Sequence, residues 1–270
     1  MIKKKLGILL LLILLSGCAT SAPESLAFTP APATQTPFAP EADSAYTPVV
    51  FSDFPGIFIL SMNEGKYAHL FAYSPIDQPL LRLTDGLWDD ITPALSPDGT
   101  KIAFASNRSG YWDLYLLDIQ SAETTRLTNT KAYDGAPSWS PDGAWLASET
   151  YYNNSLEIIV QPISDSSQEA IYLTSDPAAD HSPAWAPTGR QLAFVSTRSG
   201  NSEIYLADLE DASNNRFLNL SNTPLTNETH PVWSWDGSKL AWAANAYAEG
   251  PSGIYVWELE KPGLPATHIG

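Results

Sequence analysis

Four acidic residues occupy the same position in successive copies of a repeated segment. Their carboxylates are the clearest reactive groups in the chain. Each stands three positions before a proline that begins a repeated segment. The four are Asp90, Asp134, Asp180 and Glu228. Carboxylates that converge on one site offer the oxygen ligands that Ca²⁺ prefers, and they also attract a lysine or arginine side chain of a partner. The alternative is structural, with each acid capping a loop and accepting backbone N–H hydrogen bonds from a neighbouring segment.

Two histidines, His181 and His230, follow the last two of these acids. Imidazoles beside carboxylates are able to bind a transition metal or to act as a general base. They stand two and one residues before their prolines, and they belong to no metal motif such as His-Glu-x-x-His. They also fit as polar residues at loop ends. The six residues together form a candidate ligand or cation site, and whether a metal occupies it is left open.

Three aromatic residues in connecting segments form a second candidate set. Tyr111 and Trp112 occupy a hairpin where a later copy has Asn201-Ser202, and Trp88 precedes a repeat. Exposed aromatic rings suit sugar rings or the anchor points of protein interfaces, although packing between sheets is the alternative. The chain has no Gly-x-Ser-x-Gly elbow and no phosphate-binding glycine loop. We therefore expect a binding module rather than an enzyme.

The elements that must position these residues are short strands in a repeat of forty-odd residues. The repeat begins at Pro48, Pro93, Pro137, Pro183 and Pro231, which are 45, 44, 46 and 48 residues apart. The segments alternate apolar and polar residues, and they are rich in turn residues and aromatics, as strands are. Four short strands per unit with this period are typical of propeller blades. The sequence therefore predicts an all-β propeller of about five four-stranded blades over 47–270, starting near 47, 92, 136, 182 and 230.

The turn residues of each unit explain its geometry. In Ser140-Pro141-Asp142-Gly143, proline presets the first turn position, aspartate hydrogen-bonds the local backbone and glycine takes a left-handed conformation. Three tryptophans stand two residues after a repeat proline, and we expect them to pack between sheets. They are Trp139, Trp185 and Trp233. Single copies of the repeat differ from the others at three positions. Leu95 stands in place of the tryptophan, Thr188 in place of the turn aspartate and Trp235 in place of the turn proline.

These elements resemble the PD40, or TolB-like, family of WD40-related propeller repeats. The likeness rests on Pro-x-Trp-Ser-Pro-Asp-Gly, Ile-Ala-Phe, Ser-x-Arg-x-Gly, Ile-Tyr and Arg-Leu-Thr, and it covers about residues 47–270. It implies the propeller fold, and it places the candidate acids around one mouth of the central channel. Fold alone does not assign activity. Some polysaccharide lyases resemble this repeat family and use channel-mouth histidines with a metal. The propeller half of prolyl oligopeptidases also resembles it.

The amino terminus resembles a bacterial lipoprotein signal. A basic start, Met1 to Lys5, precedes the apolar run Leu6 to Leu15, which is too short to span a bilayer of about 30 Å. Leu15-Ser16-Gly17-Cys18 resembles a lipobox, which implies cleavage before Cys18 and lipidation of its thiol. Cys18 is the only cysteine, so an intrachain disulfide is excluded. We assign 1–17 to the signal peptide and expect a lipid anchor facing the extracytoplasmic side.

Residues 18–46 hold the lipidated cysteine and a linker rich in Pro, Ser, Thr and Ala. Without apolar periodicity, the linker is predicted to be disordered. The whole chain carries a formal charge of −16, which repels phosphate backbones and excludes nucleic acid as a partner. We expect a membrane-anchored scaffold for an unknown protein, peptide or glycan. The alternatives are a carbohydrate-active, oligosaccharide lyase-like enzyme, or a metal-binding propeller that uses the acidic mouth.

Overall fold

The computed structural model describes residues 56–75, 78–163, 169–187, 189–211, 213, 216–246, 252–261 and 265–269. The predicted signal peptide, Cys18, the linker and the first repeat segment at 47–52 lie outside the described residues. No helix among the described residues is long and apolar enough to cross a membrane.

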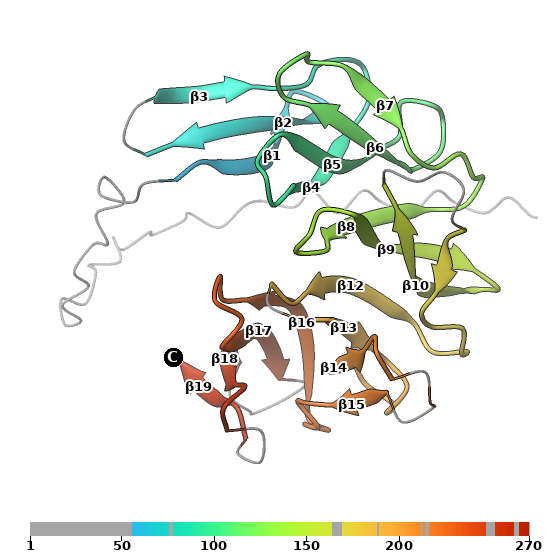
Figure 1. The fold of residues 1–270 in the computed structure, drawn as a ribbon, viewed down its shortest axis with the longest axis vertical. Coiled ribbons are helices and arrows are strands. Elements are labelled where there is room, and N and C mark those ends of the chain that lie inside the picture. The colour runs from blue at the N-terminus through green and yellow to red at the C-terminus, as the bar shows by residue number, and fades with distance from the viewer. Residues whose placement is uncertain are drawn as a thin grey trace, which may run out of the picture. The chain divides into compact units, whose positions relative to one another are not determined.

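Five antiparallel sheets make up the described part of the chain, and strands follow one another in sequence order within each sheet (Figure 1). The first sheet contains β1 (Phe58–Glu64), β2 (Tyr67–Ser74) and β3 (Gln78–Arg82). The second contains β4 (Asp90–Leu95), β5 (Lys101–Ser106), β6 (Asp113–Asp118) and β7 (Thr124–Arg126). The third contains β8 (Asp134–Trp139), β9 (Trp145–Tyr152), β10 (Ser155–Pro162) and β11 (Ile171–Tyr172). The fourth contains β12 (Asp180–Trp185), β13 (Gln191–Ser196), β14 (Glu203–Asp208) and β15 (Phe217–Asn219). The fifth contains β16 (Thr226–Trp233), β17 (Lys239–Ala246), β18 (Gly253–Glu258) and β19 (Thr267–Ile269).

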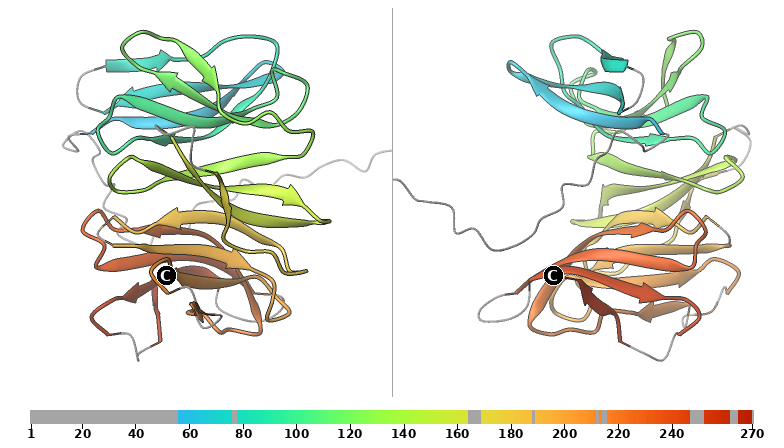
Figure 2. Two further views of the ribbon diagram at one scale, coloured as in Figure 1. Left: turned by 45° about the vertical axis from the view of Figure 1, so that its right-hand side comes forward. Right: turned by 90° about the vertical axis from the view of Figure 1, so that its left-hand side faces the viewer.

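The sheets follow one another around an axis as propeller blades do, with β4, β8, β12 and β16 on the inner side (Figures 1 and 2). Each of these inner strands contacts the next one. Within the described residues, no comparable contact joins the fifth sheet to the first. The predicted all-β propeller of about five blades is confirmed.

The three described strands of the first sheet correspond to the second, third and fourth strands of the others. The Leu70 N–H donates to the Thr84 hydroxyl (3.0 Å), as the Leu114 N–H of β6 donates to Thr128 (2.9 Å). β2 is therefore a third strand by position. The predicted inner strand of this blade falls in the segment that the structure does not describe.

The predicted tight turns join the first and second strands. In the third sheet, the Ser140 hydroxyl and the Ala144 N–H both donate to Asp142 (2.5 and 3.0 Å). Gly143 has a φ of 68°, the left-handed conformation that glycine adopts without strain. These local hydrogen bonds fix the register of each hairpin.

A bulge interrupts every described inner strand at the residue before the repeat proline. Thr92, Ala136, Ser182 and His230 have φ values of 50°, 46°, 53° and 54°. The strand register shifts at each of these points. Positive φ is sparsely populated by non-glycine residues, so the surrounding sheet must hold it in place. The bulge turns these four residues toward the channel described below.

The core lies between neighbouring sheets rather than within one sheet. Phe104 of the second sheet packs with Leu70 of the first, and Phe194 of the fourth sheet packs with Ile158 of the third. Trp139, Trp185 and Trp233 pack in three successive interfaces, as predicted. Each sheet therefore depends on its neighbour to bury its apolar face.

Candidate functional site

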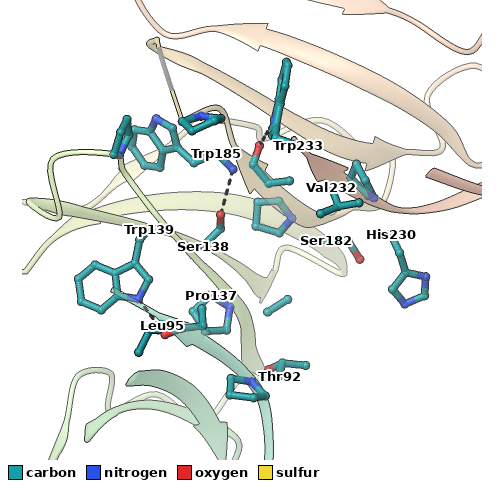
Figure 3. Close-up of a pocket in the computed structure, with 18 of the residues that line it drawn as sticks. Thr92, Leu95, Pro137, Ser138, Trp139, Ser182, Trp185, His230, Val232 and Trp233 are labelled. Atoms are coloured by element: carbon teal, nitrogen blue, oxygen red, sulfur yellow. Dashed lines mark hydrogen bonds between the residues drawn. The ribbon is translucent and has the colours of Figure 1, made fainter. Parts of the chain in front are cut away.

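A channel with a volume of about 1040 Å³ runs along the inner strands β4, β8, β12 and β16. Its wall consists mainly of prolines and tryptophans (Figure 3). The prolines are Pro93, Pro97, Pro137, Pro141, Pro183, Pro187 and Pro231. The tryptophans are Trp139, Trp185, Trp233 and Trp235. Rings of this kind lose little conformational freedom when they are covered, so the wall is preorganised for contact.

Hydrogen bonds hold the wall tryptophans in place. The indole N–H of Trp139 donates to the Ala94 carbonyl, and that of Trp233 donates to the Ala184 carbonyl, both at 3.0 Å. The Trp185 backbone N–H donates to the Ser138 hydroxyl at 2.9 Å, the contact drawn in Figure 3. The Trp185 indole N–H is buried and has no hydrogen-bond partner among the described residues.

Large apolar side chains remain exposed along this channel. Trp235 is 91% exposed, Val232 is 60% exposed and Leu95 is 40% exposed. Trp235 stands where the other turns place Pro97, Pro141 and Pro187, and all four residues line the channel. An exposed indole beside a proline-lined cavity is the kind of anchor that dominates protein interfaces.

One carboxylate, Glu149 of β9, also lines the channel although it is only 8% exposed. It accepts the Tyr133 hydroxyl at Oε1 (3.0 Å) and the Ser182 N–H at Oε2 (2.7 Å). Burial and the charge of Glu149 raise the pKa of Tyr133, so the phenol keeps its proton and remains the donor. The site therefore holds an oriented carboxylate in a wall whose other polar groups include hydroxyls and the His230 imidazole.

Gly135 makes room for this arrangement. It pairs with Glu149 across β8 and β9. A Cβ at Gly135 would overlap the Tyr133 hydroxyl. Tyr133, Gly135 and Glu149 therefore form one packed unit.

Of the two predicted histidines, His230 lines the channel and His181 does not. His230 is exposed. His181 is half-buried, and its Nδ1 lies 3.0 Å from the Ser182 hydroxyl. Burial lowers the pKa of His181 despite the opposing charges of Glu149 and Asp180, which favours the neutral imidazole.

The four predicted acids are buried inside their own blades and do not line the channel. Asp90 and Asp180 pair with Arg108 and Arg198, each at 2.8 Å. The other two accept hydroxyl groups. Asp134 accepts Thr130 and Thr150, and Glu228 accepts Thr223 and Thr226. Burial raises the pKa of Asp180 and of Glu228. The four acids therefore lie buried away from the channel lining, and ligand or cation binding by them stays a prediction.

No group of three or more His, Cys, Asp or Glu side chains in the described ranges is placed to hold a metal ion. Calcium binding by the four acids stays a prediction without geometric support. The candidate aromatics divide as well. Tyr111 is exposed, Trp112 packs edge-on against Tyr133 with ring centroids 6.5 Å apart, and Trp88 is half-buried under Arg108.

The sequence analysis did not identify Glu149, because this residue lies outside the repeated segment that precedes each proline. The available signal was its strand position. The residues in register with Glu149 are Ala105, Val195 and Ala243, which are all apolar. Aligning the second strand of every blade would have identified a charged residue at an apolar position.

Comparison with known proteins assigns the family. The TolB beta propeller domain (PD40) matches residues 83–171 and 136–265. The chain belongs to this family. This agrees with the repeat motifs and with the five sheets.

Individual relatives match only part of the propeller. A TolB homolog of Chlorobaculum tepidum is 32% identical over 91 residues, or 34% of this chain and 21% of the relative. A Tol-Pal system protein TolB of Francisella tularensis is 34% identical over 94 residues, again 34% of this chain and 21% of the relative. These matches span about a fifth of the relatives' length.

Solved structures share the fold. TolB of Acinetobacter baumannii superposes with a TM-score of 0.70 and 22% identity, covering 80% of this chain and 53% of that chain. An oligogalacturonate lyase in complex with manganese gives a TM-score of 0.60 and 13% identity, covering 80% of this chain and 63% of that chain. These likenesses concern the fold alone.

Proposed function

We propose that this chain is a membrane-anchored, extracytoplasmic scaffold whose channel binds a segment of a protein partner. The observation that carries the proposal is the preorganised channel wall of prolines and hydrogen-bonded indoles, with Trp235 exposed beside it. Extended peptide segments are known to dock into aromatic-lined grooves of this character. A curated relative carries the name Tol-Pal system protein TolB, and a role in a system of several proteins agrees with a binding scaffold.

The membrane part of the proposal rests on the sequence around Cys18. The basic start, the ten-residue apolar run and the small residues before Cys18 support processing as a lipoprotein. Two or more acyl chains would hold the chain stably at the lipid surface. The residues from Ala19 to about Tyr46 would then act as a spacer between the membrane and the propeller.

The anchor is tested by metabolic labelling with palmitate in a bacterial host that expresses the full chain. Label should enter the wild-type chain and be absent from Cys18→Ser, which should also leave the membrane fraction. Equal labelling of both chains, or equal membrane association, would reject the anchor.

Channel binding is tested by site-specific photo-crosslinking in cells. A photoreactive phenylalanine analogue at position 232, inside the channel, should crosslink a discrete partner. The same analogue at position 119 is the control, because Ile119 is exposed but does not line the channel. Trp235→Ala should weaken the crosslink. Equal products at both positions, or none at 232, would reject the proposal.

The alternative activity, cleavage of an oligosaccharide, is favoured by His181 and His230, which lie near Glu149 and near each other. Metal analysis of the purified chain, with an oligogalacturonate cleavage assay on wild type and on His181 and His230 variants, decides it. Metal-dependent cleavage that both variants lose would establish the enzyme.

A further inference from the structure

Glu149 is a buried carboxylate that forms no ion pair with a lysine or arginine among the described residues. Asp90, Asp113 and Asp180 are buried and each pair with an arginine. The other buried acids of the described residues accept hydroxyl groups instead, and they are Asp134, Glu157, Glu203 and Glu228. Glu149 differs from all of these acids because it lines the channel. An ionised carboxylate removed from water is destabilising unless a counter-charge compensates it. The propeller fold does not require a charged residue at the strand position of Glu149, since three blades have apolar residues there.

The Glu149 carboxylate is able to accept further hydrogen bonds. Each Glu149 oxygen accepts one described donor, and an ionised carboxylate has about four acceptor positions. Tyr133 and Ser182 fix its orientation, and Gly135 leaves the space that Tyr133 needs. The group is therefore positioned before any ligand arrives, which favours a specific contact.

We propose that Glu149 receives the ammonium or guanidinium group of a lysine or arginine side chain that a bound peptide segment inserts into the channel. This inference rests on the proposed function of the channel. Proline and indole surfaces along the wall suit the apolar stem of such a side chain, and the carboxylate suits its charged end. The formal charge of −16 attracts basic segments over a longer range.

A cationic side chain fits the site better than a metal ion. Ca²⁺ takes six to eight oxygen ligands, and transition metals need several convergent donors. Glu149 belongs to no such group among the described residues. Burial favours the neutral form of nearby His181, so this imidazole brings no competing positive charge near neutral pH.

The test uses the full chain and defined peptides. Capped nonapeptides are selected from a displayed random library on the wild-type chain. Each selected peptide is then resynthesised with its basic residue as arginine, lysine, norleucine or glutamate. Isothermal titration calorimetry measures the dissociation constants for wild type, Glu149→Gln and Glu123→Gln. Glu123 is exposed and does not line the channel. Glu123→Gln therefore serves as the control, because it removes one negative charge as Glu149→Gln does.

We expect selected peptides to share one arginine or lysine. Glu149→Gln and the norleucine peptide should each weaken binding at least about tenfold, the range for a hydrogen bond to a charged group. The two changes combined should weaken binding little further, and Glu123→Gln should have no effect. Glu149→Gln should also unfold at the same or a higher temperature than wild type, which a purely structural role would not give.

Four results overturn the inference. Peptides without a shared basic residue, or equal binding by wild type and Glu149→Gln, reject it while leaving channel binding intact. Norleucine peptides that bind wild type as tightly as arginine peptides reject it without relying on a variant. If no selected peptide is sensitive to Trp235→Ala, channel binding is rejected together with it.

Discussion

Buried charge is compensated differently from blade to blade. Asp90 and Asp180 pair with arginines that also lie over aromatic rings, whereas Asp134 and Glu228 accept threonine hydroxyl groups. The blades with arginine use it as a structural ion pair. The third and fifth blades use threonine hydroxyls at this position, and the third blade also holds Glu149.

Arg198→Met tests the structural ion pair. Arg198 lies 2.8 Å from Asp180, which is fully buried, and 3.1 Å from Asp176. Loss of the guanidinium leaves a buried carboxylate uncompensated, so the free energy of unfolding should fall by about 3–5 kcal/mol in urea titrations at pH 7. Adding Asp180→Asn should recover part of the loss. Lys239→Met, which removes an exposed pair, should change stability by less than about 1 kcal/mol; equal effects would contradict the prediction.

Gly135→Ala tests the packing beside Glu149. The new methyl group would overlap the Tyr133 hydroxyl and displace the ring from Glu149. We expect a loss of about 1–3 kcal/mol in the free energy of unfolding. Gly189→Ala is the matched control, because a methyl group there would have no heavy atom within 4 Å and its φ is not in the left-handed region. A Gly135→Ala protein as stable as Gly189→Ala would show that this close approach is unimportant.

His181 should make stability depend on pH. Its pKa is lowered in the folded chain, mainly by burial, so the unfolded chain binds the proton first as pH falls. The contribution of His181 to stability is therefore present above its ordinary pKa near 6.5 and is lost as pH falls through that value. The difference in melting temperature between wild type and His181→Gln should shrink from pH 7.5 to pH 5.5. A difference that stays constant with pH would show that burial does not lower the pKa of His181.

At the scale of the element, the four blades whose inner strand is described each repeat a tight turn, a bulged inner strand and an inward-facing wall residue. The turn fixes the hairpin register, and the bulge directs the residue before the proline into the channel. Function then depends on which residue occupies each repeated position. Trp235 replaces a turn proline, and Glu149 replaces a small apolar residue.

Gly143→Ala tests the turn. Gly143 has a φ of 68° and no nearby atom that would clash with a methyl group, so the effect reports backbone strain alone. The left-handed conformation is less favourable for alanine by about 1–2 kcal/mol. Urea titration should show a loss in this range with an unchanged denaturant slope. No loss would mean that the turn relaxes to another conformation.

At the scale of the molecule, five sheets bury their faces against one another, and the whole chain carries a formal net charge of −16. Neighbouring sheets contact one another through their inner strands. Among the described residues, no comparable contact joins the fifth sheet to the first. Like charges spread over such a fold repel one another, and this repulsion is screened by salt.

Salt should therefore stabilise the chain. We expect the melting temperature to rise as sodium chloride increases from 20 to 300 mM, and potassium chloride should act equally because screening is not ion-specific. Calcium chloride at matched ionic strength should add no more than these salts. A distinctly larger rise with calcium would instead support the calcium site expected from Asp90, Asp134, Asp180 and Glu228.

The sequence by itself determined the propeller, because its signals are local. Repeat prolines, Ser-Pro-Asp-Gly turns and alternating strands act over a few residues, and their period identified blades and the tryptophans between them. It also identified the acids as a repeated feature. It could not show where those acids point.

Only the tertiary structure decided which groups share the channel. Glu149 meets the Ser182 N–H across 33 positions of chain, and Asp180 is neutralised by an arginine brought close only by strand pairing. Burial and ion pairing depend on how sheets stack, and a repeated acid has the same local sequence signature whether it faces solvent or the interior. The candidate site therefore moved from the predicted acids to one carboxylate in a channel lined largely by prolines and tryptophans.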